Sequence, residues 1–404
     1  MGGTRPARRN LAPDGGIGIL SGYELVQDEA RLAELTAEAC GASGYALDTE
    51  FHREQTYFPR LGLVQLAWAG RVVLVDPLAT SLEPLKALLD SRATAVMHAP
   101  DQDLEILRHV VGQAPARLMD TQTAAGFCGL RSASLRDLLA RFLEIDVAKG
   151  DRLTDWLRRP LQPEQLEYAA GDVRHLLELW AALGTRLRAL GRLKWCEEEC
   201  ELLRVRQSAA RRPEEAWLRV RELRRLPRRS QPLAIAVAGW RERRAAQLDI
   251  PARYVLSDLA LAAVVQAAPD SRAALVAVRG VEGRAMTGST GAELLEVIRR
   301  ARRNPPQVPP KPKGSDRSHL QPVVALVSAW LSQVARDDDL DPALVATRAD
   351  LTSFLEGEPG ARLATGWRYE RYGSRVEELV TGKAAVALES GGKLRIERRS
   401  GRPL

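Results

Sequence analysis

Cysteine is scarce in this sequence, and its spacing excludes two classes of small stabilised domain. The 404-residue chain has only four cysteines, at positions 40, 128, 196 and 200, and none forms a Cys-x-x-Cys pair. A zinc ribbon needs paired cysteines, and a disulfide framework needs a dense set of them. Cys196 and Cys200 are spaced to share one helix face, but no histidine lies near them, so we interpret them as packed thiols. This cysteine usage favours a reducing compartment such as the cytoplasm.

Long apolar runs are also missing near the N-terminus. Residues 1–19 contain Gly, Pro and Arg but no stretch long enough for a signal peptide or a membrane span. Pro6 stands where a myristoylation signal requires Ser or Thr. We therefore expect residues 1–22 to form a flexible tail on a cytoplasmic protein that makes no contact with membranes.

Acidic residues are fewer than basic residues, 52 against 59, which gives a formal net charge of +7. The excess is local: residues 201–230 hold ten Arg and four Glu, and residues 299–313 hold four Arg and two Lys without an acid. Such segments favour a polyanionic partner, nucleic acid above all. The alternative is that they are solvated helix faces, in which case RNA affinity would not fall steeply with added salt.

The order of predicted elements divides the chain into an α/β part and a helical part. A chain of this length usually forms two to four domains. Strand-like runs are concentrated in the first ~200 residues, which predicts an α/β domain with a mixed sheet followed by helical modules. Five prolines among residues 304–314 predict an extended linker between two such modules. The expected strands are 45–51, 61–69, 71–76, 95–98 and 384–388, with a hairpin at Gly70; the expected helices include 28–40, 82–89, 101–111, 134–143 and 163–190.

Two carboxylates interrupt the first predicted strand, Tyr45 to Phe51. Asp48 and Glu50 stand two positions apart, and side chains at i and i+2 of a strand point to the same face. Adjacent anions repel, so a cation is expected between them. A divalent Mg²⁺ or Mn²⁺ fits best, because these hard ions prefer carboxylate oxygens. The alternative is a strand end whose acids reach solvent or an arginine.

Two further acids occupy positions from which they could join this pair. Asp103 follows the apolar run 95–98 at a strand-to-helix junction, where open α/β sheets place their ligands. Asp172 lies in the predicted helix 163–190, and Tyr168 precedes it by four residues on the same helix face. His98 is interpreted as a packed or hydrogen-bonded histidine and is left out of the site.

Together these segments resemble the Tyr-containing branch of the DEDD exonuclease superfamily, and within it the ribonuclease D family. The resemblance covers residues 23 to 205, and six short segments in the family's order make chance agreement improbable. Its most specific segments are Leu47 to Glu54, Tyr57 to Gln65, His98 to Leu104, Asp120 to Gln122, Asp155 to Leu161, and Tyr168 with Asp172. The chain departs from the family at Arg152 and Thr154, where Gln and Ser are usual.

The resemblance continues into the helical part, which is similar to HRDC domains. It implies an α/β RNase H-like exonuclease domain with a mixed sheet, followed by two small all-α HRDC-type domains, the second more divergent. The expected limits are a tail at 1–22, the exonuclease domain at 23–205, HRDC domain 1 at 212–303, a basic Pro-rich linker at 304–317, and HRDC-like domain 2 at 318–404.

The resemblance also implies the site residues and two divalent metal ions, Mg²⁺ or Mn²⁺. Asp48, Glu50 and Asp172 would hold the metal that activates water, while Asp48 and Asp103 would support the second metal. Tyr168 would orient the attacking water. The four acids and Tyr168 form the expected catalytic set, and the four acids are the expected metal ligands.

The implied activity is 3′→5′ exoribonuclease activity that releases 5′-nucleoside monophosphates and matures the 3′ ends of tRNA precursors and other small stable RNAs. The expected partner is RNA, and the protein is expected to be a monomer. Two alternatives stay open: a DNA exonuclease of the Werner-like type, since metals that contact phosphate discriminate sugars poorly, and a catalytically dead nucleic-acid-binding scaffold.

Overall fold

A computed structural model describes residues 22–146, 154–206, 212–283, 286, 289–308 and 317–399. The predicted N-terminal tail, Arg152 and most of the predicted Pro-rich linker therefore lie outside the described residues. Within the described ranges, no helix is both long and apolar enough to cross a membrane.

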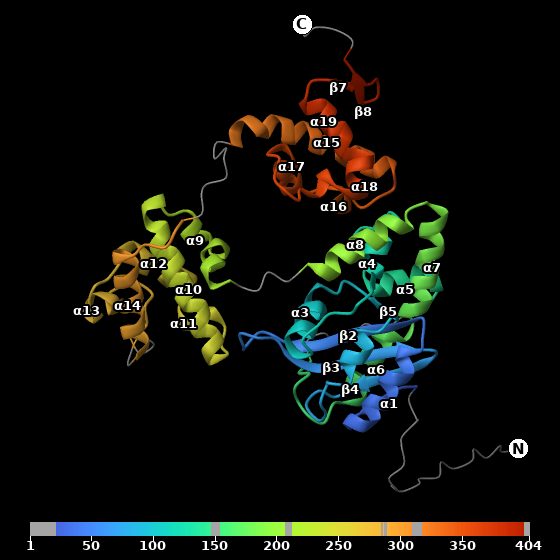
Figure 1. The fold of residues 1–404 in the computed structure, drawn as a ribbon, viewed down its shortest axis with the longest axis horizontal. Helices are drawn as coiled ribbons and strands as arrows, with labels where there is room; N and C mark the ends of the chain where they lie inside the picture. The colour runs from blue at the N-terminus through green and yellow to red at the C-terminus, as the bar shows by residue number, and fades with distance from the viewer. Residues whose placement is uncertain are drawn as a thin grey trace, which may run out of the picture.

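A six-stranded mixed sheet forms the centre of the N-terminal domain, as predicted (Figure 1). The strand order is β1-β4-β3-β2-β5-β6. β2 pairs antiparallel with β3, which pairs antiparallel with β4 across a tight turn at Ala69 and Gly70, whose φ angles are 47° and 78°. The other pairs, β1 with β4, β2 with β5 and β5 with β6, are parallel. The bounds are β1 Glu24–Val26, β2 Gly44–His52, β3 Arg60–Trp68, β4 Arg71–Val75, β5 Thr94–Met97 and β6 Leu118–Asp120.

Helices cover both faces of this sheet. Apolar residues of α1 (Glu29–Cys40), α2 (Leu85–Leu89) and α3 (Asp101–Val110) share one core with Leu47, Val64 and Leu66. On the opposite face, Ala169, Ala170 and Val173 of α6 (Pro163–Arg174) pack against Ala46, Leu63 and Leu74 in a second core. The alternation of inward residues along β2 and β3 follows from the two-residue period of a strand.

The prediction of one helix over residues 163–190 is wrong, because the chain forms two helices. α6 ends at Arg174, His175 leaves helical geometry with φ −113° and ψ 7°, and α7 (Leu176–Ala189) begins immediately after it. The two helices serve different cores: α6 packs on the sheet, while Leu179, Leu183 and Leu187 of α7 belong to a third core. A straight helix cannot follow both surfaces, so the break lies between them.

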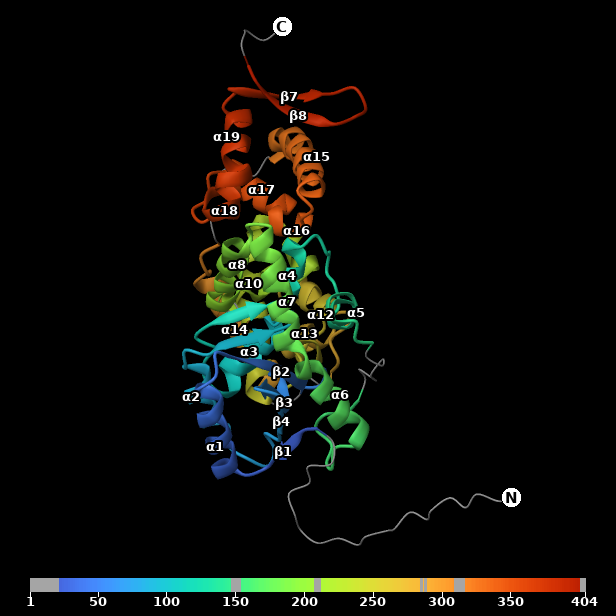
Figure 2. The ribbon, with the colours of Figure 1, turned by 90° about the vertical axis from the view of Figure 1, so that its right-hand side faces the viewer.

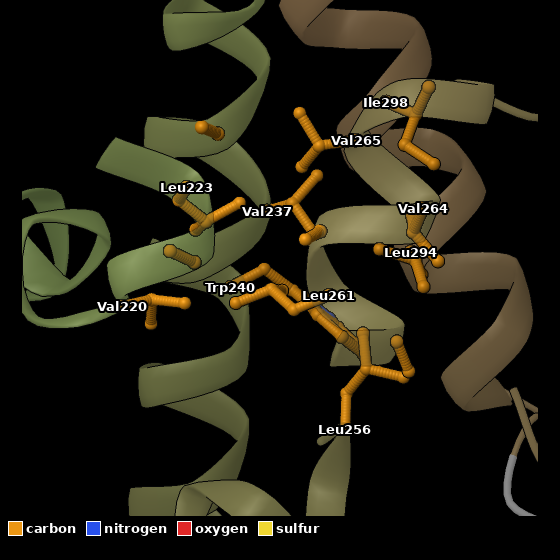
Figure 3. Close-up of a cluster of buried hydrophobic side chains, with 14 of the residues drawn as sticks. Val220, Leu223, Val237, Trp240, Leu256, Leu261, Val264, Val265, Leu294 and Ile298 are labelled. Atoms are coloured by element: carbon orange, nitrogen blue, oxygen red, sulfur yellow. The ribbon is translucent and has the colours of Figure 1, made fainter. Parts of the chain in front are cut away.

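The first helical domain has an apolar core of its own. That core combines residues of α9 (Arg221–Arg224), α10 (Gln231–Leu248), α12 (Asp258–Ala267) and α14 (Ser289–Arg303). Figure 3 shows Val237 and Trp240 of α10 facing Val265 and Leu261 of α12. The short helices α11 (Ala252–Val255) and α13 (Arg272–Val276) complete the domain. In the described residues of this region every regular element is helical, as predicted.

The C-terminal domain is not entirely helical. Its helices are α15 (Gln321–Asp337), α16 (Pro342–Val345), α17 (Arg348–Leu355), α18 (Gly366–Arg368) and α19 (Ser374–Val380). The predicted strand 384–388 forms as β7 (Ala384–Leu388) and pairs antiparallel with β8 (Leu394–Arg398), which was not predicted. The expectation of an all-α second module is therefore wrong, because the domain contains this β-hairpin. Figure 2 shows the hairpin above α15 and α19.

This C-terminal domain shares its core with the exonuclease domain rather than enclosing one of its own. Trp330 and Trp367 belong to the same apolar cluster as Phe127, Leu183 and Cys196, which come from α4 (Thr121–Phe127), α7 and α8 (Leu193–Val205). α5 (Leu135–Leu143) contributes Leu138 and Leu139 to the same cluster. The rings of Trp195 and Trp367 stack with centroids 5.1 Å apart. Figures 1 and 2 both show this domain seated on α4 and α8.

A buried ion pair attaches the segment before α6 to the sheet. Arg159 donates hydrogen bonds to both carboxylate oxygens of Asp76, at 2.6 and 2.8 Å, and to the carbonyl oxygens of Gly62 and Trp156. Gly62 has no side chain at the point of closest approach: a Cβ there would lie 2.7 Å from the Cβ and the carbonyl oxygen of Trp156. This contact determines where α6 begins and therefore where its side chains reach the sheet.

We predict that Arg159→Met lowers the free energy of unfolding by about 3–5 kcal/mol near neutral pH, because it leaves the Asp76 carboxylate buried without its partner. Burial alone would raise the pKa of Asp76, but hydrogen bonds from Arg159 and Gln27 outweigh it and hold the pKa below its usual value. The ion pair therefore stabilises the fold above the unfolded pKa of an aspartate, near ~3.9, and this contribution is lost as pH falls through the lowered value.

Denaturant titrations of both proteins from pH 7 to pH 3 would measure this difference, which should shrink at the acid end. Arg158→Met is the matched control, because Arg158 is the exposed neighbour and shows no contact with Asp76. A difference that stayed constant across the pH range would contradict the assigned role of the ion pair.

Candidate metal centre

The carboxylates of Asp48 and Glu50 project from the face of β2 that α6 covers. Both residues follow Ala46 at two-residue intervals, and Ala46 packs against Ala169, Ala170 and Val173 of α6. A bulge follows at Glu50 and Phe51, where the register with β3 shifts. The expectation that the two acids share one face is met, and that face lies beneath a helix.

α6 brings a third carboxylate to this pair. Asp48, Glu50 and Asp172 each offer an oxygen, and these three oxygens all lie within 4.8 Å of one another. All three residues are half-buried, so a ligand can still reach them. Tyr168 lies one turn before Asp172 on the same helix, and its ring centroid is 6.2 Å from that of Trp156. The i, i+4 spacing noted in the sequence therefore places Tyr168 on the same face of α6 as Asp172.

Asp103 approaches from the other side of β2. It lies in the first turn of α3, directly after β5, and its side chain is buried. The hydroxyl of Thr49 donates a hydrogen bond to its Oδ1. Asp103 is not one of the three residues whose oxygens lie within 4.8 Å of one another. Its charge nevertheless reaches the group, because it raises the pKa of both Asp48 and Glu50.

Burial and mutual repulsion make these carboxylates hard to ionise without a cation. Burial, followed by the charges of Asp103, Asp172 and Glu50, raises the pKa of Asp48 well above its usual range. Burial and the charges of Asp172 and Asp103 raise the pKa of Glu50 to about 8. Burial also raises the pKa of Asp103, although the Thr49 hydrogen bond opposes it.

Among the described residues, neither Asp48 nor Glu50 forms an ion pair with Lys or Arg. The alternative interpretation, a strand end neutralised by arginine, is therefore not supported for these two acids within that part of the chain. Carboxylates such as Asp48 and Glu50, whose pKa values are raised and which form no ion pair with Lys or Arg in the part of the chain that the structure describes, fit a hard divalent cation.

His98 has the hydrogen-bonded role expected for it. Its Nδ1 is 2.9 Å from the hydroxyl of Thr121, and burial lowers its pKa. Asp120 accepts a hydrogen bond from the backbone N–H of Ala99 and caps α4 through the N–H groups of Gln122 and Thr123. These contacts fix the junction from which α3 and Asp103 start.

The sequence did not indicate that the first helical domain contacts the segment leaving β2. The Tyr57 hydroxyl donates to Glu242 of α10 at 2.8 Å, and the backbone N–H groups of Tyr57 and Phe58 donate to Asp249 at 3.1 Å. Phe58 also stacks on His109 of α3, with ring centroids 4.6 Å apart. Figure 1 shows this loop reaching from the sheet to α10. The partners are more than 180 residues apart, so no local pattern could have revealed the contact.

Comparison with known proteins agrees with the fold. A family model described as 3′-5′ exonuclease matches residues 23–188, and the HRDC domain model matches residues 231–298. The solved structure of Escherichia coli RNase D, an exoribonuclease involved in structured RNA processing, has a TM-score of 0.81 and 30% identity, covering 89% of this chain and 99% of that one. The fold and the acidic centre define a metal-dependent 3′→5′ exonuclease.

Relatives that align with most of this chain identify the family within the class of 3′→5′ exonucleases. Ribonuclease D of Zymomonas mobilis is 35% identical over 384 residues, which are 91% of this chain and 97% of the relative. Ribonuclease D of Gluconacetobacter diazotrophicus is 36% identical over 351 residues, which are 85% of this chain and 89% of the relative. The chain belongs to the ribonuclease D family, and it is a 3′→5′ exoribonuclease. The HRDC model matches only the first helical domain, so a second HRDC domain stays a prediction.

We predict that Glu50→Gln stabilises the protein near neutral pH in the presence of a chelator. A carboxyl whose pKa is raised to about 8 must take up a proton or bear repulsion on folding, and this cost is lost with the amide. The melting temperature in EDTA should rise by about 2–4 °C for each kcal/mol of repulsion relieved. The stabilisation produced by adding Mn²⁺ should become smaller, because one ligand is lost.

Differential scanning calorimetry with EDTA and with Mn²⁺ would test both parts of this prediction. Glu54→Gln makes the same substitution at an exposed site four residues along the chain and should change neither quantity. A Glu50→Gln protein that melts below the wild type in EDTA would show that the carboxylates do not repel as described.

Proposed function

We propose that this exoribonuclease uses two divalent metal ions, Mg²⁺ or Mn²⁺, held by Asp48, Glu50, Asp103 and Asp172. The observation that carries the proposal is the convergence of three carboxylates from β2 and α6, with Asp103 adding its charge from α3. When bound, the two ions would supply Lewis acidity to the attacking and leaving oxygens of an in-line displacement. Asp48 would contribute to holding both ions.

The side chains around the acids would position the reactants. Tyr168 stands one helical turn from Asp172, from which its hydroxyl would orient the attacking water. Thr49 holds the Asp103 carboxylate in place through its hydrogen bond. Arg159 and Trp156 keep the start of α6 on the sheet, which would bring Tyr168 and Asp172 to the site together. Hydrolysis at the last phosphodiester would release 5′-nucleoside monophosphates one at a time.

We further propose that the substrates are tRNA precursors and other small stable RNAs, processed in the cytoplasm by a monomer. The naming of the relatives and the structured RNA processing ascribed to the Escherichia coli protein support this substrate class. The basic excess of residues 201–230 supports contact with an RNA backbone. Four cysteines without a disulfide are consistent with a reducing compartment. We retain the predicted domain limits of 23–205, 212–303 and 318–404 as part of this proposal.

We predict that Asp103→Asn lowers the rate of RNA degradation by about 10²-fold or more, because one of the carboxylates that hold metal is neutralised. RNA affinity should stay close to that of the wild type, since the basic segments supply it separately. Single-turnover degradation and filter binding on one labelled RNA would measure the two quantities.

Asp101→Asn is the matched control, because Asp101 lies two residues earlier in the same helical turn and is exposed. It should keep wild-type activity. Full activity of Asp103→Asn would remove Asp103 from the site, and an inactive wild type that still binds RNA would favour the dead scaffold.

We predict that, with Mg²⁺ present, a tRNA precursor with a 3′ extension loses single nucleotides from that end and that a matched DNA oligonucleotide is degraded more slowly. The 3′ end is the expected point of attack because the family is a 3′→5′ exonuclease family. A mass-resolved time course with and without EDTA would report direction, product and metal requirement together. Faster loss of DNA would favour the DNA exonuclease alternative. That alternative is open because metal ions that contact phosphate do not distinguish the sugars.

A further inference from the structure

Gln65 of β3 is a buried polar residue whose side-chain amide forms no hydrogen bond among the described residues. Its exposed fraction is 0%, and neither its Nε2 nor its Oε1 has a hydrogen-bond partner among the described residues. A buried amide left unsatisfied costs free energy, whereas an apolar side chain of the same shape would not. Both amide atoms lack a partner, so exchanging the assignments of nitrogen and oxygen does not change this result.

The register of the sheet places Gln65 beside Asp48. In the antiparallel pair of β2 and β3, Gln65 is the partner of Asp48, and in the pair of β3 and β4 it is the partner of Leu74. Directly opposite residues of an antiparallel pair project to the same face, with Cβ atoms about 4.5–5.5 Å apart. Leu63 and Ala67, two positions away on β3, pack in the core beneath α6, which confirms that Gln65 faces this helix and the acidic centre.

Acceptors on this face are few. The neighbours of Gln65 along β3 and on β4 are apolar: Leu63, Ala67 and Leu74. Asp76, beyond β4, already accepts hydrogen bonds from Arg159 and Gln27. Asp48 is the carboxylate directly opposite Gln65 in the register of the sheet.

We propose that Gln65 is a positioning residue. Its amide, which makes no hydrogen bond among the described residues, donates one to the Asp48 carboxylate when a divalent metal is bound and holds that carboxylate in its ligating orientation. The proposal rests on the metal site proposed above. Ligating carboxylates are usually oriented by such a second hydrogen bond. One oxygen of Asp48 would accept from Gln65, which leaves the other directed toward Glu50 and Asp172. The neutral amide adds no charge, so it orients Asp48 without competing with the cation.

The test is a titration of the RNA-free protein with Mn²⁺, followed by isothermal calorimetry, for wild type and Gln65→Met. Methionine keeps the length of the side chain but removes the donor. We expect the variant to bind Mn²⁺ ~10-fold more weakly, as is typical when an orienting hydrogen bond is lost. Its melting temperature in EDTA should equal or exceed that of the wild type, because an unsatisfied buried amide has been removed.

Tyr45→Phe is the matched control. The Tyr45 hydroxyl is also buried without a partner among the described residues, and it lies on β2 but in the core on the opposite face of the sheet. Its removal should leave Mn²⁺ affinity unchanged. Wild-type affinity in Gln65→Met would overturn the proposal, as would an equal loss of affinity in Tyr45→Phe.

Two further measurements keep the outcome decisive. If Gln65→Met does not fold, Gln65→Leu is the second apolar variant. In wild type labelled with ¹⁵N-glutamine, the side-chain amide resonance of Gln65 should shift on addition of Mg²⁺, and an unshifted resonance would overturn the proposal.

Asp48→Asn separates failure of the metal site from failure of the role of Gln65. If it binds Mn²⁺ as well as the wild type does, the metal site itself is wrong. If it does not bind while Gln65→Met binds normally, only the role of Gln65 is wrong.

Discussion

Repulsion among buried carboxylates is the constraint around which the exonuclease domain is arranged. Asp48, Glu50 and Asp172 offer oxygens within 4.8 Å of one another, and the charge of Asp103 reaches them from the far side of β2. Burial removes the water that would otherwise screen these charges. The surrounding structure must therefore hold the carboxylates together against their mutual repulsion until a cation neutralises them. Several contacts elsewhere in the domain contribute to holding them.

Contacts with the rest of the domain hold the three elements that carry the acids: β2, α6 and α3. The β2 strand lies between β3 and β5 in the middle of the sheet, so Asp48 and Glu50 cannot move apart without breaking a ladder. The Arg159–Asp76 pair and the close contact at Gly62 anchor the segment before α6, which carries Asp172. Hydrogen bonds at Asp120 fix the junction before α3, which carries Asp103. The four acids thus come from three elements, β2, α3 and α6, and each element has its own anchor.

The two helical domains are attached to this core in different ways. The C-terminal domain shares an apolar core with α4, α7 and α8, and Arg368 adds a buried ion pair with Glu199. The first helical domain has its own core and contacts the exonuclease domain through polar groups such as Tyr57, Glu242 and Asp249. Burial of apolar area is the stronger and less reversible attachment. The first helical domain is therefore the one whose position relative to the active site depends on a few hydrogen bonds next to β2.

Local patterns in the sequence determined the alternation of β2, the hairpin at Gly70, the mixed sheet and the shared face of Asp48 and Glu50, because these depend on spacing along the chain. Tertiary structure alone decided the break at His175, the strands β1, β6 and β8, the shared C-terminal core and the Tyr57 contacts. The three-residue strands β1 and β6 carry too little periodicity to be recognised. Pairings such as Asp48 with Gln65 depend on register between strands, which periodicity within one strand cannot specify.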